Sequence, residues 1–375
     1  MARAGLQAAS LPMKVRSRST GRHRRHRSGG PRDGALLPRF WGACALACLL
    51  LAASTSPAAA LEFHVDQAIG NDARSAVQAQ SPTTPWRTIA KALATVGTGN
   101  TIRVHSGTYA ETLSSRVAGV TLLADGPERS VVVAPPAGAS ALDVKHHDVV
   151  VDGLVLRGGV HGIRAEGADG LVVRGCSAVA QSANGFTVIA TQGVTLDGVV
   201  AVSSGSRGIL LERTSRAYVR NALVYDAGEW GIGLENVPAS GALPPVSTDN
   251  VIAFCTVAFS GGGRGGAIRV RNAIAEIRDS VLADNQPYGI RLDTIGSSLH
   301  HDLISGSDHP LSPGDYPVGA GMLAGDPLFV APAGPDGARG GVDGFADDDF
   351  SLAQIAAGDG AQSPAVDAGS GDVAT

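Results

Sequence analysis

Short valine-rich runs alternate along the chain with turn-forming Gly, Asn, Asp and Ser, and one signature returns at a fixed interval. A glycine followed by an apolar residue occurs in HGIR, NGFT, RGIL, WGIG, GGAIR and YGIR, at Gly162, Gly185, Gly208, Gly231, Gly266 and Gly289. Every step has the same length except the one from Gly231 to Gly266, which is one period plus an insertion. Such self-similarity indicates stacked repeats that share one continuous core.

A second strand signature precedes each glycine and supports the same period. It can be aligned at Gly153, Gly175, Gly198, Asn221, Phe254 and Asp279, and a further step of one period reaches Asp302. The runs lack the 3.6-residue periodicity of helices, and the LxxLxLxxN pattern of leucine-rich repeats is missing. We therefore predict an all-β solenoid, a parallel β-helix of about seven or more coils of about 23 residues.

Both ends of the repeat array carry motifs of their own. HVD, GND, TPWRTIAKAL and GNTIRVHSGTYAE lie within residues 64–111, where Pro85 and the apolar face of Trp86, Ile89, Ala92 and Leu93 predict a helix that ends near Val96. DPLFV, DDDFSL and SPAVDAG follow the last coil. Together these segments resemble secreted bacterial right-handed β-helix repeat proteins of the pectate-lyase-like superfamily, with their uncharacterised N-terminal cap domain. The resemblance implies right-handed coils, a capping helix, and an irregular Asp- and Gly-rich C-terminal cap.

The segment 1–60 differs in composition from the rest of the chain. An arginine-rich start leads to the apolar run FWGACALACLLLAA and then to small residues at Ala58 and Ala60. This order predicts a signal peptide cleaved near Ala60 and a secreted, periplasmic or cell-surface protein without a membrane span in its mature chain. The alternative is a membrane anchor, for which the apolar run is short. The expected organisation is a signal peptide at 1–60, an N-terminal cap and first strands at 61–118, a β-helix at 119–310, and a C-terminal cap segment at 311–375.

The basic leader partly offsets the negative net charge of the mature chain. It holds 10 of the 30 Lys and Arg but one of the 34 acidic residues, so the remainder has 20 basic against 33 acidic residues. The acidic excess is concentrated after residue 307, and no broad basic face exists for nucleic acid. We expect a monomer that does not bind nucleic acid.

Two cysteines, Cys176 and Cys255, survive removal of the leader. They occupy the same repeat position three coils apart, which separates them by about 14 Å at the spacing of β-strands. A disulfide needs Cα atoms within about 7 Å. The prediction is two free, inward-facing thiols.

Alternation along the strand that begins at each glycine identifies the outward-facing side chains. Glu212 and Glu235 then lie on adjacent coils with their carboxylates about 5 Å apart. The following coils add Arg269, Arg271, Arg291 and Asp293. Two acids so close suit an acid and base pair or a Ca²⁺ site. A solvated charge ladder without chemistry is the alternative.

The residues just before the glycines form a flanking column, which is His161, Asn184, Arg207, Trp230, Gly265 and Tyr288. Arg207, Trp230 and Tyr288, with Asp293, are candidates for substrate binding, because aromatic planes stack on sugar rings and polar groups meet hydroxyls. Packing at the edge is the alternative role for Trp230. The insertion from Val237 to Thr248 is expected to overhang this region.

Two further charged sets lie elsewhere in the chain. The column Asp152, Arg174, Asp197, Arg220, Ala253, Arg278 and His301 is typical of a structural ladder of exposed ion pairs. The acidic cluster Asp343, Asp347, Asp348 and Asp349 is a Ca²⁺ candidate that lacks EF-hand spacing, and a solvated acidic loop is the alternative.

The resemblance implies a polysaccharide partner, and lyases of this superfamily use Lys or Arg as the base with Ca²⁺ or arginine neutralising the substrate carboxylate. Lys91 and Lys145 lie away from the charged face, so the candidate bases are Arg269, Arg271 and Arg291, while Glu212 and Glu235 would serve a hydrolase. Two hypotheses follow. One is an exported β-helix that binds and cleaves a polysaccharide as a lyase or hydrolase, with Ca²⁺ as the one cofactor to consider. The other is a non-catalytic, adhesin-like surface module.

Overall fold

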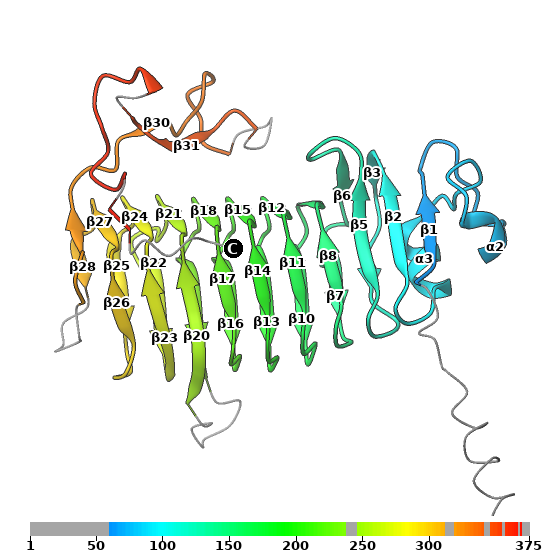
Figure 1. Cartoon of the computed structure of the whole chain (residues 1–375), viewed down its shortest axis with the longest axis horizontal. Helices are drawn as coiled ribbons and strands as arrows, with labels where there is room; N and C mark the ends of the chain where they lie inside the picture. The colour runs from blue at the N-terminus through cyan, green and yellow to red at the C-terminus, as the bar shows by residue number, and fades with distance from the viewer. Residues whose placement is uncertain are drawn as a thin grey trace, which may run out of the picture. The chain divides into compact units, whose positions relative to one another are not determined.

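A computed structural model describes residues 60–237, 246–311, 319–340, 346–354, 357–366 and 368–369. All of the predicted signal peptide except Ala60 lies outside these residues. Within the described part, the chain winds into a right-handed parallel β-helix of about nine turns, which confirms the predicted fold class (Figure 1).

Each turn contributes one strand to each of three parallel sheets, which we call sheets 1, 2 and 3 in chain order. Sheet 1 contains β1 (Glu62–Val65), β2 (Thr101–His105), β5 (Thr121–Asp125), β8 (Val150–Asp152), β11 (Val172–Arg174), β14 (Thr195–Asp197), β17 (Tyr218–Arg220), β20 (Ser247–Ala253), β23 (Ala273–Arg278) and β26 (Ser298–His300).

Sheet 2 contains β3 (Gly107–Tyr109), β6 (Val131–Val133), β9 (Val155–Arg157), β12 (Ser177–Val179), β15 (Val200–Val202), β18 (Leu223–Tyr225), β21 (Thr256–Ala258), β24 (Val281–Ala283), β27 (Leu303–Ser305) and β29 (Leu323–Ala324). Sheet 3 contains β4 (Leu113–Ser114), β7 (Leu142–Val144), β10 (Ile163–Glu166), β13 (Phe186–Ile189), β16 (Arg207–Glu212), β19 (Trp230–Glu235), β22 (Gly265–Arg271), β25 (Pro287–Leu292) and β28 (His309–Leu311).

The observed strand register confirms most of the predicted repeat. Ile163, Phe186, Ile209, Ile232, Ile268 and Ile290 stand in one column of sheet 3. The glycine column is wrong at one coil, because Trp230 pairs with Gly266 and the partner of Gly231 is therefore Ala267. The coil with the insertion is thus one residue longer than the spacing of the glycines indicated. Gly266, and not Gly265, is the member of the flanking column on this coil.

Sharp corners between sheets 1 and 2 explain the second repeat signature. The residues there adopt a left-handed backbone, with φ between 52° and 77°, at Gly153, Gly175, Gly198, Asn221, Phe254, Asp279 and His301. Glycine adopts this conformation without a steric penalty, and Asn and Asp tolerate it better than most residues. The predicted alignment is wrong only at its last step, where it placed Asp302 at the corner. Arg278 pairs with His300, so His301 occupies the corner of the coil after that of Asp279. The ladder column therefore ends at His300.

The interior is filled by the inward residues of all three sheets. Cys176 and Cys255 are both buried and free, as predicted. Burial raises the pKa of each thiol to about 12, so neither is a ready nucleophile.

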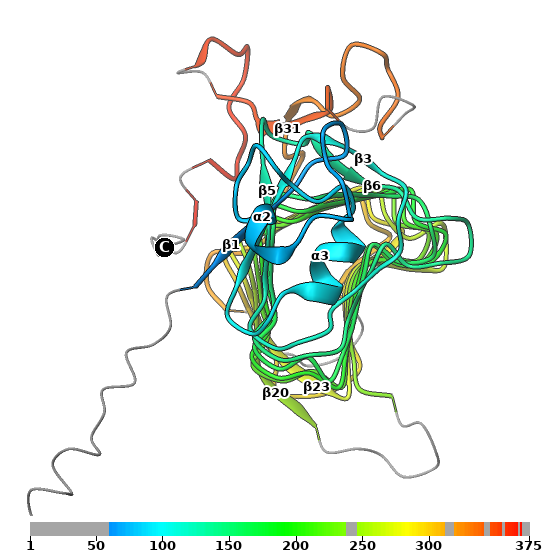
Figure 2. The same ribbon diagram turned by 90° about the vertical axis from the view of Figure 1, so that its right-hand side faces the viewer.

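The N-terminal end of the solenoid is closed by helix α3 (Ile89–Thr95), which lies inside the predicted helical range, and a short helix α2 (Ala76–Ala79) precedes it (Figure 2). Thr88 caps α3 through its side chain, and Glu111 accepts hydrogen bonds from the backbone amides of Ile89 and Ala90. Trp86 is fully buried before the helix and stacks on Phe63 of β1. The helix therefore covers the end of the apolar core.

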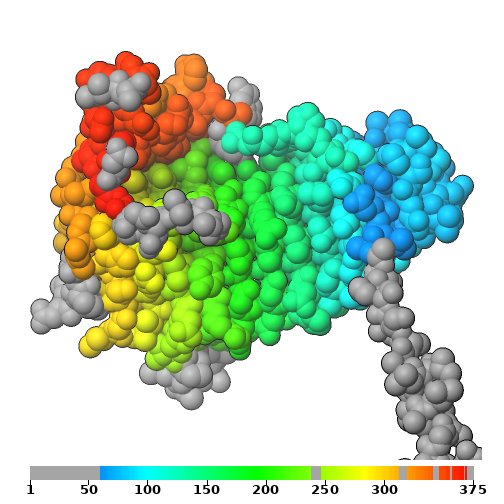
Figure 3. Space-filling view, in the orientation of Figure 1, coloured from blue at the N-terminus to red at the C-terminus, as the bar shows by residue number. Residues whose placement is uncertain are grey.

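The C-terminal segment packs along the side of the solenoid. Its strands β30 (Phe329–Ala331) and β31 (Asp349–Leu352) pair antiparallel, and Phe350 contacts Tyr225 and Phe259 on the outer face of sheet 2 (Figures 1 and 3). Arg339 also pairs with Asp226. The described part of this segment thus acts as a lateral cover over several coils. Among the described residues, no helix is long and apolar enough to cross a membrane.

Candidate functional site

The predicted site lies on the outer face of sheet 3, across β16, β19, β22 and β25. Glu212, Glu235 and Arg271 are neighbours in one row of this face, as the alternation predicted. A second row contains Gly233, Arg269 and Arg291. The register therefore gathers both acids and all three candidate arginines on four successive coils.

Glu235 is held by Arg207 and is 5% exposed. The Nε and Nη2 atoms of Arg207 both donate to Oε1 of Glu235, at 3.1 and 2.9 Å. The arginine reaches Glu235 by lying over Gly233, where an added Cβ would stand 3.1 Å from its Cδ. Glu235 is thus a buried, paired carboxylate, and the absence of a side chain at 233 makes room for the pair.

Glu212 has a separate cationic partner. Its Oε1 lies 3.5 Å from Nη2 of Arg213, which follows it in the chain. The two glutamates are adjacent in register, but each is neutralised by its own arginine. The geometry therefore does not isolate them as a pair of free carboxyl groups.

Asp293 is clasped by two arginines. Its Oδ2 accepts hydrogen bonds from Nε and Nη2 of Arg269, at 3.1 and 3.0 Å, and its Oδ1 accepts one from Nε of Arg291, at 2.9 Å. Burial alone raises the pKa of Asp293, but the hydrogen bonds from Arg291 and Arg269 outweigh it and hold the pKa below its usual value. Asp293 therefore fixes both guanidinium groups in place.

Arg271 differs from the other arginines of this face. It is exposed, and no ion pair or hydrogen bond of its side chain occurs within the part of the chain that the structure describes. It lines a shallow hollow together with Arg269, Arg291, Asp293, Asn272 and Thr294. Three arginines and one aspartate leave a net positive charge there, which we call the arginine hollow.

The aromatic residues beside the arginine hollow pack on one another. Trp230 and Tyr288 lie on either side of Gly266 in the register, with their ring centroids 6.0 Å apart and their planes 15° from parallel. The Arg269 guanidinium lies over the Trp230 ring and that of Arg291 over Tyr288. Trp230 is 3% exposed, so the packing alternative describes it, while Tyr288 remains partly exposed.

The earlier coils of the same face carry a polar network in place of charges. Thr187 accepts a hydrogen bond from the Asn184 amide at 3.1 Å and lies 3.2 Å from Nδ1 of His161. Asn184 also accepts from the backbone amide of Arg207. Thr187 and Asn184 are buried, so this part of the flanking column joins coils together and leaves little open surface.

The remaining predicted elements fall partly outside the described residues. Residues 238–245 of the insertion and Asp343 are among those not described. Asp348 accepts hydrogen bonds from the Tyr225 hydroxyl and the backbone amide of Gly340, and Asp349 accepts one from the amide of Ser351. Asp348 thus anchors the C-terminal segment, and calcium binding by this cluster stays a prediction.

One surface was missed in the sequence. Tyr218, which is 51% exposed, lines an open groove at the corner between sheets 3 and 1, together with His147, Asp169, Gln192 and Arg216. These residues come from successive coils at the same corner. The only sequence feature that points to this groove is Tyr218, an aromatic residue at an outward position of β17. The charged column beside it was interpreted as structural, and Tyr218 was not considered.

Comparisons with known proteins agree with the architecture. Residues 140–303 match a family model described as the right handed beta helix region. The structure of pectate lyase Pel9A superimposes with a TM-score of 0.54 at 15% identity, covering 72% of this chain and 82% of that chain. At this identity the likeness concerns the fold alone.

Two further solved structures align less closely. An alginate lyase from Paenibacillus sp. str. FPU-7 has a TM-score of 0.41 at 13% identity, covering 63% of this chain and 95% of that chain. A rhamnogalacturonan lyase has a TM-score of 0.43 at 12% identity, covering 79% and 97%. No curated protein matches the sequence.

Proposed function

We propose that this right-handed β-helix binds an acidic polysaccharide along the outer face of sheet 3, with the arginine hollow as the point of anion contact. The observation that carries the proposal is the state of Arg271, which is exposed and unpaired among the described residues beside two arginines fixed by Asp293. A guanidinium group binds carboxylate or sulfate through two parallel hydrogen bonds. An uronate unit is therefore the substrate class that this hollow fits.

The form of the face supports a chain-like ligand. Strands of neighbouring coils are about 4.8 Å apart, so a face of several coils offers repeated contacts to a repeating polymer. Tyr288 is partly exposed at the border of the hollow, where its ring is available to a sugar face. The fold is shared with pectate lyase Pel9A, and we extend the substrate class of that enzyme, pectate, to this chain as part of the proposal.

Binding fits the geometry better than hydrolysis does. A hydrolase needs one carboxyl group that donates a proton and one that stays ionised, and here Glu212 and Glu235 are each paired with an arginine. Cleavage by β-elimination needs a base that can accept the proton next to the uronate carboxylate, and Arg271 is the candidate of suitable exposure. The experiment below therefore distinguishes a lyase from an adhesin-like module that only binds.

The full chain is to be incubated with polygalacturonate, alginate and a neutral mannan, with and without Ca²⁺, while binding, unsaturated product and new reducing ends are measured. We expect binding to the two uronans that falls as salt rises. Arg271→Gln should weaken the affinity about tenfold or more, since a charge-assisted hydrogen bond contributes roughly 1.5–3 kcal/mol. Arg116→Gln, an exposed arginine after β4, is the matched control and should bind as the wild type does.

The outcomes separate the alternatives. Unsaturated product that disappears in Arg271→Gln assigns a lyase, and binding without product assigns a binding module. Equal affinity of Arg271→Gln and the wild type, or equal binding of mannan and uronans, would refute the arginine hollow as the site.

Export belongs to the same proposal. The leader ending near Ala60 would place a monomeric mature chain where extracellular glycans occur. N-terminal sequencing of protein recovered from the expressing cells and their medium tests this, since an intact leader on soluble exported protein would contradict it.

A further inference from the structure

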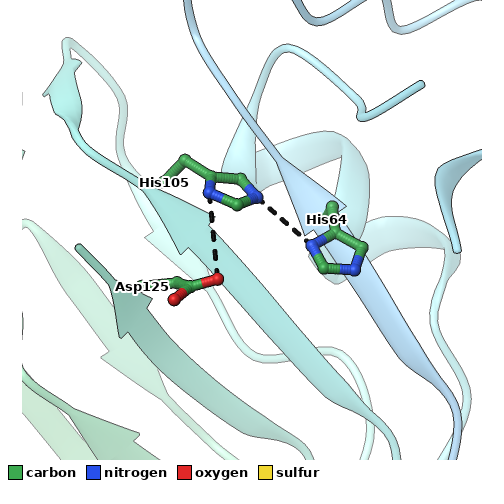
Figure 4. A group of neighbouring side chains, drawn as sticks. All are labelled: His64, His105 and Asp125. Carbon is green, nitrogen blue, oxygen red and sulfur yellow. Dashed lines mark hydrogen bonds and ion pairs between the residues drawn. The ribbon is translucent and has the colours of Figure 1, made fainter. Parts of the chain in front are cut away.

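A group of side chains that could bind a metal ion lies at the N-terminal end of sheet 1, whereas the arginine hollow lies on later coils of sheet 3. His64 of β1, His105 of β2 and Asp125 of β5 come from three adjacent strands, and one ligand atom from each lies within 4.8 Å of the others (Figure 4). We infer that His64, His105 and Asp125 form a binding site for a divalent transition metal ion of the Zn²⁺ class, which joins the first three strands of sheet 1.

Strand alternation brings the three side chains to one face. Phe63 and Val65 of β1 are buried in the core, as are Ile102 and Val104 of β2, so His64 and His105 point to the outer side of the sheet. Asp125 is the register partner of His105 on the next strand. The three residues are distant from one another in the sequence, so only the coiling of the solenoid creates this group.

The three ligand atoms lie within 4.8 Å of one another, somewhat farther apart than the ligand atoms of a bound zinc ion. Nδ1 of His64 lies 3.2 Å from Nε2 of His105, and Nδ1 of His105 lies 3.8 Å from Oδ2 of Asp125. Ligand atoms of a tetrahedral zinc ion, each about 2.0–2.2 Å from it, are about 3.3–3.6 Å apart. The two distances end on different nitrogens of His105, and one ion binds only one of them. Side-chain rotation of His105 and Asp125 is therefore needed to bring the three ligand atoms to this spacing.

The chemical state of the rings suits a ligand. Two ring nitrogens 3.2 Å apart exclude a proton on both, so at least one imidazole offers a lone pair. His64 is 8% exposed, so the packing around it holds its ring beside that of His105. The nearby Arg103 is held by Glu62 through two hydrogen bonds of 2.9 Å and is not free to compete for Asp125.

The backbone beneath the site is fixed. The Tyr109 hydroxyl donates to the carbonyl oxygen of His105 at 2.9 Å and accepts from the amide of Gln67. Asp125 keeps 39% of its side chain exposed and His105 25%, so an ion can enter from solvent. Two imidazoles and one carboxylate leave a coordination position for water, and this donor set favours Zn²⁺ and similar ions over Ca²⁺.

A metal ion here would have a structural effect. β1 is the first strand of sheet 1 and pairs only with β2 among the named strands, so its free edge is held by few bonds. An ion bound to the folded protein raises its stability by mass action. We therefore expect Zn²⁺ to raise the melting temperature and to protect the N-terminal cap from proteolysis.

The test uses the metal-stripped full chain with Zn²⁺, measuring bound zinc per chain and melting temperature, and with Co²⁺, measuring visible absorption. Wild-type protein should bind one equivalent more than His105→Asn, and Asp125→Asn should weaken that site about tenfold or more. His23, His26, Cys44 and Cys48 of the leader are present in every variant, so only the difference between variants is informative.

A double variant, His300→Ala with His301→Ala, is the matched control because it removes an adjacent histidine pair at the other end of sheet 1. It should bind as much zinc as the wild type does. Equal zinc content in wild type, His105→Asn and Asp125→Asn, all with the same circular dichroism, would overturn the inference and leave a stacked histidine pair. His105→Asn is preferred to a change at buried His64, so that loss of metal is not confused with loss of fold.

Discussion

Gly233 matters because of what lies over it. The Arg207 side chain crosses this position to reach Glu235, and a Cβ there would meet Arg207 and Oε1 of Glu235 at 3.1 to 3.2 Å. Neither neighbour can move without weakening the ion pair, and Glu235 is too buried to find water instead. The ion pair between Arg207 and Glu235 therefore depends on the absence of a side chain at position 233.

Gly233→Ala is predicted to destabilise the protein by about 1–3 kcal/mol, through overpacking and the weakened pair. Urea unfolding followed by circular dichroism measures the change. Gly97→Ala is the control, since a Cβ there meets only the Asn100 amide at 3.6 Å. A Gly233→Ala variant as stable as Gly97→Ala would show that Arg207 has another equally good position.

Asp302 is a buried carboxyl group in the column of Cys176 and Cys255. Its Oδ1 accepts from the Ser280 amide at 2.9 Å, whereas Oδ2 has no partner among the described atoms. Burial is the main cause that raises the pKa of Asp302 to about 8, with the Asp279 charge adding to it. The folded protein therefore keeps a proton that the unfolded chain, with its ordinary pKa of about 3.9, releases.

The contribution of Asp302 to stability follows from that difference. Below about pH 4 both states hold the proton. As the pH rises from there toward 8, the unfolded state binds fewer protons and stability falls. Asp302→Asn removes this dependence, so its stability relative to wild type should rise by at least about 1 kcal/mol between pH 5 and pH 8.

Urea unfolding at the two pH values measures this relative change, with exposed Asp308→Asn as the control. Parallel pH profiles for Asp302→Asn and wild type would mean that Asp302 is ionised in the folded protein.

At the scale of elements, the N-terminal helix is held by one aromatic residue that precedes it. Trp86 is fully buried, stacks on Phe63 with centroids 5.5 Å apart, and donates from Nε1 to the carbonyl oxygen of Arg74. It also forms a backbone bridge with Val65 of β1. The segment from β1 to α3 therefore depends on this ring for its fit to the first coil.

Trp86→Ala is predicted to cost about 3–5 kcal/mol, since it leaves a large cavity under α3. Trp86→Phe keeps a ring on Phe63 but loses the hydrogen bond to Arg74, and should cost less than the alanine variant. Thermal unfolding with hydrogen exchange of residues 62–105 measures both. Equal losses in the two variants would assign the stability to the hydrogen bond instead of the ring.

At the scale of the whole molecule, the C-terminal segment covers an apolar strip that a solenoid would otherwise expose. Val179, Val202, Tyr225 and Ala258 are buried on the outer face of sheet 2, and Phe329 and Phe350 pack against this strip. Inward positions of the same strands are also apolar. Sheet 2 is therefore buried on both faces along these coils.

Phe350→Ala is predicted to loosen the cover, because Phe350 contacts Tyr225, Phe259 and Phe329 at once. The expected results are increased binding of a hydrophobic dye and faster proteolysis after residue 320, with the β-sheet content unchanged. Val330→Ala, at a 47% exposed position of β30, is the control. Unchanged proteolysis in Phe350→Ala would show that Asp348 and Arg339 suffice to hold the segment.

The solenoid could be predicted from the repeat pattern of the chain alone. A constant repeat length, β-branched runs and turn residues specify strands that stack in register, and a shift of the register by a single position would turn the core outward. For that reason the inward cysteines, the adjacency of Glu212 and Glu235, and the arginines of the next coils could all be predicted. The two errors, at Gly266 and His300, lie on the coil with the insertion and on the last coil, where the number of residues per coil departs from the period.

The contacts of the surface side chains could not be predicted in this way, because they depend on how the coils stack. Which arginine pairs with which carboxylate depends on side-chain reach, and that in turn depends on small residues such as Gly233. The burial of Trp230 follows from Tyr288 and Arg269 on later coils. The histidine and aspartate cluster likewise joins three strands that are far apart in the sequence. Strand periodicity is a local property of the chain, whereas contacts between side chains of different coils exist only after the coils have stacked.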